Sequence, residues 1–291
     1  MSVGGAALAG LAVVLAALRA VYPKLLQRRA AARRPLGPDG VIGGAEATTL
    51  TRSGAPAVLL LHGGGDTPQV LRELAEHLHQ SGFSVRAPLL AKHGGELALM
   101  RAFDASEWWE QARREYDDLR ASHKCVGVAG LSVGGALAVA LAAERDVAAL
   151  VLLAPYVALP RSVRALADTG FLWGLLFPYL NSASGGSIHD HAAAARTLGR
   201  GLTTPAALRA FARVADRADA ALQRVTAPTL VIQSREDNRI SQSAAERAFA
   251  KLGAREKSFV WTEGAGHVIT VDFGKDRVFA LATEWLKRHG A

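Results

Sequence analysis

The sequence is poor in cysteine: Cys125 is the single one in 291 residues. An internal disulfide and a metal site built from several cysteines are therefore excluded. Cys125 lies within an apolar run, which predicts a buried structural thiol. The length suffices for one large hydrophobic core, so we expect one α/β domain and no division into two.

Acidic residues are absent from the first 38 positions, and this absence explains most of the net charge of +8. Six of the 34 Lys and Arg residues lie in this region, so the rest of the chain contains 28 basic and 26 acidic residues. The six are Arg19, Lys24, Arg28, Arg29, Arg33 and Arg34. The body is therefore nearly neutral, and without a basic face or stacking aromatics we expect no nucleic-acid partner.

Charge of either sign is absent from residues 1–18, and the basic cluster follows at once. With Arg19 extended toward the headgroups, the apolar stretch just reaches the length of about 20 residues that a spanning helix needs. We expect residues 1–34 to form an uncleaved membrane anchor with the body on the cytoplasmic side, since positive charge follows the segment. A signal peptide and a helix docked on the body are the alternatives, as are a cytoplasmic or an exported protein.

Short apolar runs alternate with amphipathic stretches from about residue 41 onward, after a linker rich in Pro and Gly. The runs occupy residues 57–61, 84–90, 125–130, 149–155, 229–234 and 257–262. Runs of this kind are typical of parallel strands buried on both faces. Helical patterns over residues 68–80, 105–120 and 132–143 supply crossovers between them. The alternation predicts a mostly parallel sheet with helices on both faces.

No strand pattern appears between residues 156 and 225, which interrupt this alternation. The segment contains the apolar "FLWGLLFPYL" and a helical pattern over residues 204–225. We predict a helical cap over a lipophilic pocket, with extra core helices as the alternative. The core then comprises residues 41–155 and 226–291.

The stretch "GLSVG" (Gly130 to Gly134) places Ser132 between an apolar strand and a helix of small residues. This is the setting of a nucleophile elbow, in which a strained turn exposes the serine hydroxyl above the sheet. Flanking glycines let strand and helix approach closely. By itself the motif is equally compatible with a serine that only caps the helix.

A second glycine-rich turn, "LLLHGGG", ends the strand at 57–61. Acyl transfer builds negative charge on a carbonyl oxygen, and two backbone N–H groups commonly stabilise it. We assign these oxyanion donors to Gly64 and Val133, and expect His62 to organise the turn. A phosphate-binding loop is disfavoured, because its lysine and hydroxyl residue are missing.

A serine needs a base to become a nucleophile, and the nine histidines compete for that role. His267 follows the last predicted strand and comes after Ser132 in the chain, as this type of fold requires. An orienting acid should follow the preceding strand, where Glu236 and Asp237 are both eligible. We choose Asp237.

Together these segments resemble the α/β-hydrolase superfamily, and most closely its bacterial carboxylesterases and monoacylglycerol lipases. The matching pieces are "LLLHGGGDTP", "APLLAKHGG", "GLSVGG", "APTLVIQSREDNRI" and "GAGHVITVDFGKDRVFALATEWL", within residues 57–288. The resemblance implies the α/β-hydrolase fold, a nucleophile Ser132, an acid Asp237 and a base His267, with Gly64 and Val133 as oxyanion donors. Where the family often has a bulky residue, Gly64 leaves the pocket more open.

The expected activity is hydrolysis of carboxylic esters, such as monoacylglycerols or other short- to medium-chain acyl esters, through an acyl-enzyme. A thioesterase or acyltransferase with the same triad is the alternative among enzymes, and a non-catalytic scaffold is the alternative outside them. We expect no cofactor and no metal. The partners expected are a small ester and a membrane, the latter by way of a bacterial inner-membrane anchor; no oligomeric state is predicted.

Overall fold

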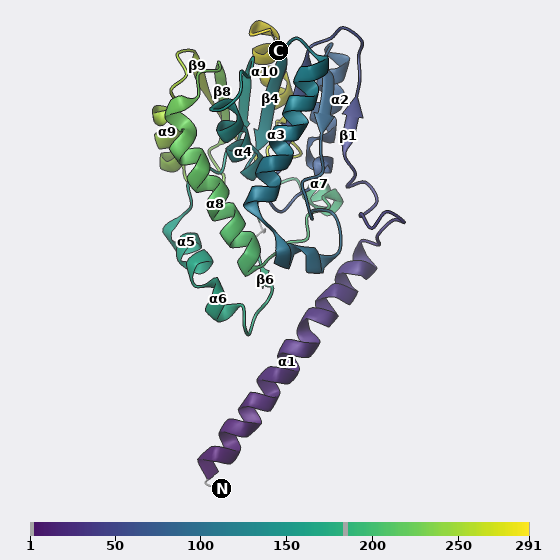
Figure 1. The fold of residues 1–291 in the computed structure, drawn as a ribbon, viewed down its shortest axis with the longest axis vertical. Helices are drawn as coiled ribbons and strands as arrows, with labels where there is room; N and C mark the ends of the chain where they lie inside the picture. Colours follow the sequence, from purple (N-terminus) through teal and green to yellow (C-terminus); the bar gives the residue numbers. More distant parts are fainter. Residues whose placement is uncertain (1–2, 183–185, 291) are drawn as a thin grey trace.

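The computed structural model describes residues 3–182 and 186–290 (Figure 1). Three predicted segments reach beyond this part of the chain: residues 1–2 of the expected anchor, residues 183–185 of the expected cap and residue 291 of the expected core lie outside the described residues. The chain begins with the long helix α1 (Val3–Arg33) and continues into a body built around a central sheet.

The central sheet has seven strands in the order β1-β3-β2-β4-β5-β8-β9. Their bounds are β1 Thr48–Leu50, β2 Ala57–Leu61, β3 Ser84–Ala87, β4 Val126–Leu131, β5 Leu150–Leu153, β8 Thr229–Ser234 and β9 Lys257–Thr262. All six expected strands are present and pair in parallel. The seventh, β1, was not expected, because three partly exposed residues form no apolar run; it pairs with β3 in antiparallel fashion. The predicted mostly parallel sheet is confirmed.

Alternate side chains of each strand enter separate cores on the two faces of the sheet. In β2, Ala57, Leu59 and Leu61 pack with α3 (Ala105–Ser122) and α4 (Val133–Ala142). Val58 and Leu60 point the other way, toward α2 (Arg72–Gln80) and α10 (Lys275–Arg288). A side-chain period of two therefore fills both layers from one continuous apolar run. α9 (Gln242–Lys251) joins the first face, and two short 3-10 helices, η1 (Pro68–Leu71) and η2 (Leu97–Ala102), complete the core elements.

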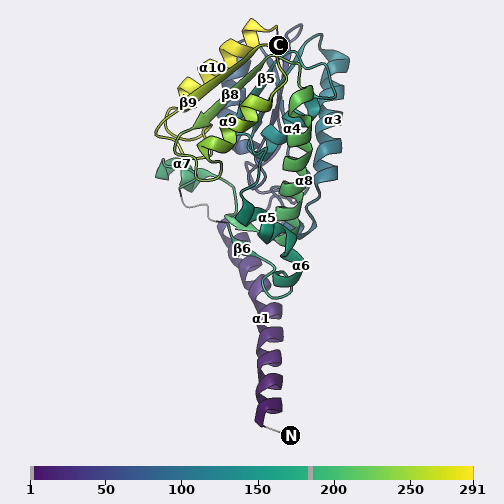
Figure 2. The same ribbon diagram turned by 90° about the vertical axis from the view of Figure 1, so that its left-hand side faces the viewer.

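Residues 156–225 contain more than the helices that we expected. The elements are α5 (Arg161–Asp168), α6 (Gly170–Trp173), β6 (Leu180–Asn181), α7 (His191–Arg196), β7 (Leu202–Thr203), α8 (Pro205–Ala221) and η3 (Leu222–Arg224). The expectation of no strand here is wrong, because β6 and β7 pair in an antiparallel sheet. Strands of two residues are too short to show a period. α8 packs along α4, while α5 and α6 lie at the end of the body toward which α1 projects (Figures 1 and 2).

α1 extends away from the body as one continuous helix that includes Pro23 (Figures 1 and 2). Only its C-terminal part approaches the body, where Leu26 and Ala30 pack against the core. Docking along the whole helix is therefore not seen. Among the helices that the structure describes, none is long and apolar enough to cross a membrane.

Cys125 is exposed, so the prediction of a buried thiol is wrong. The apolar run suggested a strand from residue 125, but β4 begins at Val126. Cys125 lies just before it, where its carbonyl accepts a hydrogen bond of 3.0 Å from the N–H of Ala57.

Candidate active site

Ser132 occupies a strained turn between β4 and α4. Its φ of 54° and ψ of −117° are rare for a residue with a side chain. Three backbone hydrogen bonds hold the turn: the Ser132 N–H donates to the carbonyl of Leu153, and its own carbonyl accepts from Ala136 and Tyr156, all at 2.9–3.1 Å. The surroundings therefore impose the conformation that the sequence pattern predicts.

Glycines on both sides of Ser132 are required by close backbone contacts. A Cβ at Gly130 would lie 2.3 Å from the carbonyl oxygen of Gly134, and a Cβ at Gly134 would lie 2.0 Å from that of Leu61. No methyl group fits at such distances. These two positions let α4 begin directly against β2 and β4, which places Ser132 at the C-terminal edge of the sheet.

Ser132, His267 and Asp237 form one chain of hydrogen bonds, although they follow three different strands. The Ser132 Oγ lies 2.8 Å from Nε2 of His267, and Nδ1 of His267 lies 2.7 Å from Oδ2 of Asp237. An ionised carboxylate only accepts, so Nδ1 carries the proton and Nε2 is left to accept from the serine hydroxyl. This is the tautomer in which an imidazole can act as a base toward serine.

Asp237 is held rigidly by several donors. The Arg239 and Ile240 N–H groups donate to its Oδ1 at 2.7 and 3.0 Å, and the Gln233 side chain donates to its Oδ2 at 2.7 Å. Burial raises the pKa of the Asp237 carboxyl, but the hydrogen bond and charge of His267 together with the backbone donors lower it further, so that the net shift is downward. Glu236 instead points to Gly264, whose N–H donates to it at 2.8 Å. Of the two eligible acids, the structure brings Asp237 to His267.

The orientation of the Gly64 N–H is set by His62. Nδ1 of His62 lies 2.8 Å from the carbonyl oxygen of Gly63, and its Nε2 accepts from the N–H of Leu90 at 3.0 Å. The proton therefore sits on Nδ1. In a trans peptide the C=O and N–H point in opposite directions, so binding the Gly63 carbonyl turns the Gly64 N–H the other way. His62 organises the turn as expected, and burial holds its pKa well below the usual range.

Val133 is the first residue of α4, where a helical N–H has no acceptor within the helix. It lies next to Ser132, and the turn after β2 lies on the other side: an ideal Cβ at Gly63 would be 3.6 Å from Cβ of Ser132. The structure thus brings the two predicted donor segments together around the serine.

Phe211 fills the space beside Gly64. A Cβ at Gly64 would lie 2.3 Å from Cε1 of the Phe211 ring, which comes from α8. The expectation that Gly64 leaves this side more open is therefore wrong: the segment 156–225 supplies the bulk that the turn lacks. The ring also stacks on Trp108, at 6.0 Å between centroids.

Two further residues near the site were not expected. Nε2 of His93 lies 2.9 Å from the carbonyl oxygen of Gly64, and its ring stacks on Phe103. Asp272 is buried, at 2% exposed. Its carboxylate accepts hydrogen bonds from the backbone N–H groups of Gly266 and His189, at 2.7 and 2.8 Å, and from those of Asp190 and Phe273. His93 belongs to the "AKHGG" motif, which was quoted above for the family resemblance but without a role for the histidine. No local sequence pattern distinguishes Asp272 from a surface carboxylate.

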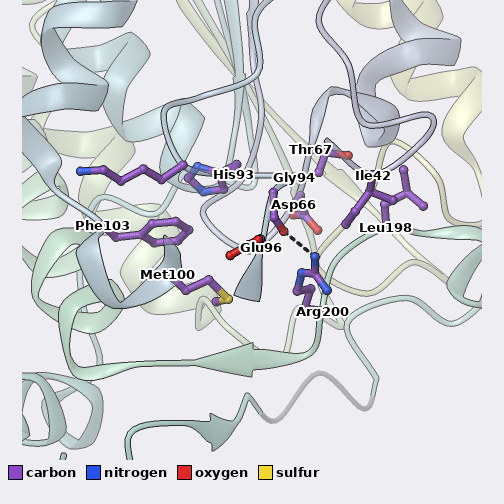
Figure 3. A pocket seen from close by; sticks show the side chains of 13 residues that line it. Ile42, Asp66, Thr67, His93, Gly94, Glu96, Met100, Phe103, Leu198 and Arg200 are labelled. Atoms are coloured by element: carbon purple, nitrogen blue, oxygen red, sulfur yellow. Dashed lines mark hydrogen bonds between the residues drawn. The ribbon is translucent and has the colours of Figure 1, made fainter. Parts of the chain in front are cut away.

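Asp66 lies on the turn after β2, near the serine. Its Oδ2 would be 2.6 Å from the same ideal Cβ at Gly63 that approaches Ser132. Burial raises the pKa of this carboxyl. It borders a small cavity of about 20 Å³ behind the turn, together with His93 and Arg200 (Figure 3). In the part of the chain that the structure describes, no group of three potential ligands could hold a metal.

Residues 53–273 match the family model described as serine aminopeptidase, S33. The chain belongs to this hydrolase family. A thermostable monoacylglycerol lipase from Bacillus sp. (strain H-257) is 27% identical over 250 residues, which are 86% of this chain and 97% of the lipase. A carboxylesterase from Bacillus subtilis (strain 168) is 24% identical over 238 residues, covering 81% of this chain and 94% of the esterase.

The family assignment agrees with the three-dimensional comparison. A solved structure from a pair of metagenome-derived lipolytic enzymes superposes with a TM-score of 0.79 at 28% identity. It covers 86% of this chain and 100% of the other. The predicted α/β-hydrolase fold is confirmed.

Proposed function

We propose that this protein hydrolyses carboxylic esters with lipophilic acyl groups, such as monoacylglycerols or short- to medium-chain esters. The observation that carries the proposal is the unbroken hydrogen-bonded chain from Ser132 through His267 to Asp237. The activities for which the two Bacillus relatives are named, monoacylglycerol lipase and carboxylesterase, support the substrate class.

In the proposed reaction, His267 takes the hydroxyl proton as the Ser132 Oγ attacks the ester carbonyl carbon. The N–H groups of Gly64 and Val133 stabilise the negative charge on the carbonyl oxygen. Collapse of the tetrahedral intermediate breaks the bond to the alcohol, which leaves with the proton from His267. Water then attacks the acyl-enzyme with His267 as base, and the acid is released. Asp237 keeps the imidazole oriented and stabilises its charged form throughout.

A fluorophosphonate probe tests the nucleophile. The wild-type protein should be labelled, and Ser132→Ala should not, whereas Ser122→Ala, on the exposed end of α3, should label like the wild type. Labelling that survives Ser132→Ala overturns the assignment of Ser132 as the nucleophile, and absence of labelling in the wild type overturns the proposal in favour of a non-catalytic scaffold.

A substrate panel tests the reaction class. We expect p-nitrophenyl esters and monoacylglycerols to be hydrolysed, with a preference among chain lengths. Turnover of acyl thioesters alone would assign the site to a thioesterase, and transfer of the acyl group to an added alcohol without release of acid would assign it to an acyltransferase. Cleavage of amino-acid p-nitroanilides in place of esters would favour a peptidase.

We also propose that α1 associates with a membrane and leaves the body on the cytoplasmic side. The absence of charge in residues 1–18, the basic residues that follow, and the projection of α1 from the body support this (Figure 2). Cell fractionation tests it. The full chain should sediment with membranes and require detergent for release, and a chain lacking residues 1–34 should not; full-length protein that stays soluble without detergent overturns it.

A further inference from the structure

A cavity of about 480 Å³ lies between the C-terminal part of α1 and the short sheet of β6 and β7. Four arginines line it: Arg29, Arg33, Arg34 and Arg200. Its other walls include the apolar side chains of Leu26, Ala30, Ala195 and Leu202 and the amide of Asn181. We refer to it as the arginine cavity. Its volume is in the usual range for small-molecule sites, and Ser132 is not among its lining residues.

Two of the four guanidinium groups are fixed by backbone carbonyls. Arg34 donates to the carbonyl oxygens of Thr197 and Gly199, which ties the end of α1 to the segment before β7. Arg200 donates to the carbonyl of Gly95 (Figure 3). Each guanidinium has five N–H donors in a rigid fork, so donors remain on both after these bonds are made.

Carbonyl groups satisfy N–H donors but do not cancel a positive charge. Within the described residues, no carboxylate forms an ion pair with any of the four arginines. Burial and the charge of Arg33 lower the pKa of Arg34, and burial and the charge of Arg34 lower that of Arg200. Like charges gathered in a partly buried space are costly unless an anion joins them.

We propose that the arginine cavity binds a phosphate-bearing anion. Planar guanidinium forks match phosphate oxygens in a bidentate manner, and several forks can share one tetrahedral group, which a carboxylate with two oxygens cannot engage as fully. The apolar walls accommodate an alkyl or glycerol portion beside the phosphate. A phospholipid headgroup and a soluble phosphate ester share this chemistry. The site is independent of the proposed hydrolysis.

The test is calorimetric titration of the full-length Ser132→Ala protein in a non-ionic detergent, a background in which ester ligands stay intact. The probes are dihexanoyl phosphatidylglycerol, inorganic phosphate, the zwitterionic dihexanoyl phosphatidylcholine, and acetate, a carboxylate with no alkyl chain to occupy the proposed acyl site. We expect the first two to bind and the last two to bind at least about tenfold more weakly. Tighter binding of phosphatidylglycerol than of phosphate identifies a lipid as the source, and equal binding identifies a soluble phosphate.

Two double variants distinguish binding in the arginine cavity from a general attraction of anions to the positive charge of α1. Arg29→Gln with Arg33→Gln removes two cavity arginines, both exposed and without an ion-pair partner among the described residues. Lys24→Gln with Arg28→Gln removes the same charge from the same helix outside the cavity. The first should weaken phosphatidylglycerol binding by about tenfold or more and the second by less than about twofold. Equal losses in the two variants, acetate binding as tight as phosphatidylglycerol binding, or no binding of either phosphate probe overturns the proposal.

Discussion

The ring of Phe211 lies against the backbone of Gly64, where a Cβ would come within 2.3 Å of Cε1. Bulk on one side of the serine is therefore provided by a helix that is distant in sequence, and the turn after β2 has room for it only because residue 64 has no side chain.

Gly64→Ala should lower kcat/KM for esters strongly, because the new methyl group collides with Phe211 and displaces the turn. In a Phe211→Ala background the same change should be tolerated, so the two effects are not additive. Measuring kcat/KM for the four proteins of this double-mutant cycle checks the coupling. Additive losses would show that the ring does not constrain the turn.

Phe211→Ala alone should widen the space beside the serine. Esters with longer or bulkier acyl groups should gain relative to short ones by several-fold in kcat/KM, while stability falls by up to about 3 kcal/mol because a partly buried ring is lost. Phe211→Leu provides the matched control and should change the chain-length preference less. An unaltered preference in Phe211→Ala would mean that the ring does not border the acyl group.

Asp237→Asn should reduce kcat at neutral pH by about 10⁴-fold with little change in KM, since an asparagine at this position no longer fixes the His267 tautomer. Glu236→Gln serves as the control, because its carboxylate contacts Gly264 and not His267. Steady-state kinetics on both variants decide the matter. Comparable losses in the two variants would argue against the assignment of Asp237.

Gly134→Ala should destabilise the fold by about 3 kcal/mol or more, since its Cβ would lie 2.0 Å from a backbone oxygen of β2 that has little freedom to move. Gly43→Ala is the matched change in open space, with no atom within 4 Å of the new Cβ, and should be neutral or slightly stabilising. Urea unfolding of both proteins tests this. A stable Gly134→Ala protein would contradict the close packing of α4 on β2.

Asp66→Asn should raise the free energy of unfolding at neutral pH. Burial raises the pKa of Asp66 in the folded state above 3.8, so the free energy of unfolding falls as the pH rises from 3.8 to that raised pKa, and the full penalty is present above it. Below pH 3.8 the carboxyl is protonated in both states and the benefit of the substitution disappears. Unfolding followed from pH 8 downward should show the gap between variant and wild type closing, and an exposed control, Glu246→Gln, should show no such gap.

Asp272→Asn should act in the opposite direction. Although burial raises the pKa of Asp272, four backbone N–H donors lower it further, so its carboxylate stabilises the fold above pH 3.8 and loses that effect as the pH falls below this value. An amide would turn donors toward N–H groups that need acceptors, at a cost of about 2 kcal/mol or more. Because Gly266 precedes His267, kcat should fall as well. Thermal unfolding and kinetics against the exposed control Glu263→Gln test both effects.

Local pattern alone determined much of this protein. Runs of apolar residues predicted six of the seven strands of the central sheet, since a strand buried on both faces must be apolar along its length. The glycines around Ser132, and the positions of Asp237 and His267 after successive strands, located three residues that the folded chain brings within hydrogen-bonding distance. Strand ends of a parallel sheet meet at one edge, so order along the chain becomes proximity in space.

Only the tertiary structure decided which residues complete this arrangement. Phe211, His93 and Asp272 reach the site from separate elements, and their roles depend on contacts that no local period records. The same holds for the arginine cavity, where Arg200 and the end of α1 are more than 160 residues apart in the chain. Sequence spacing sets the geometry of a helix or strand, but the packing of distant elements sets which side chains share a space.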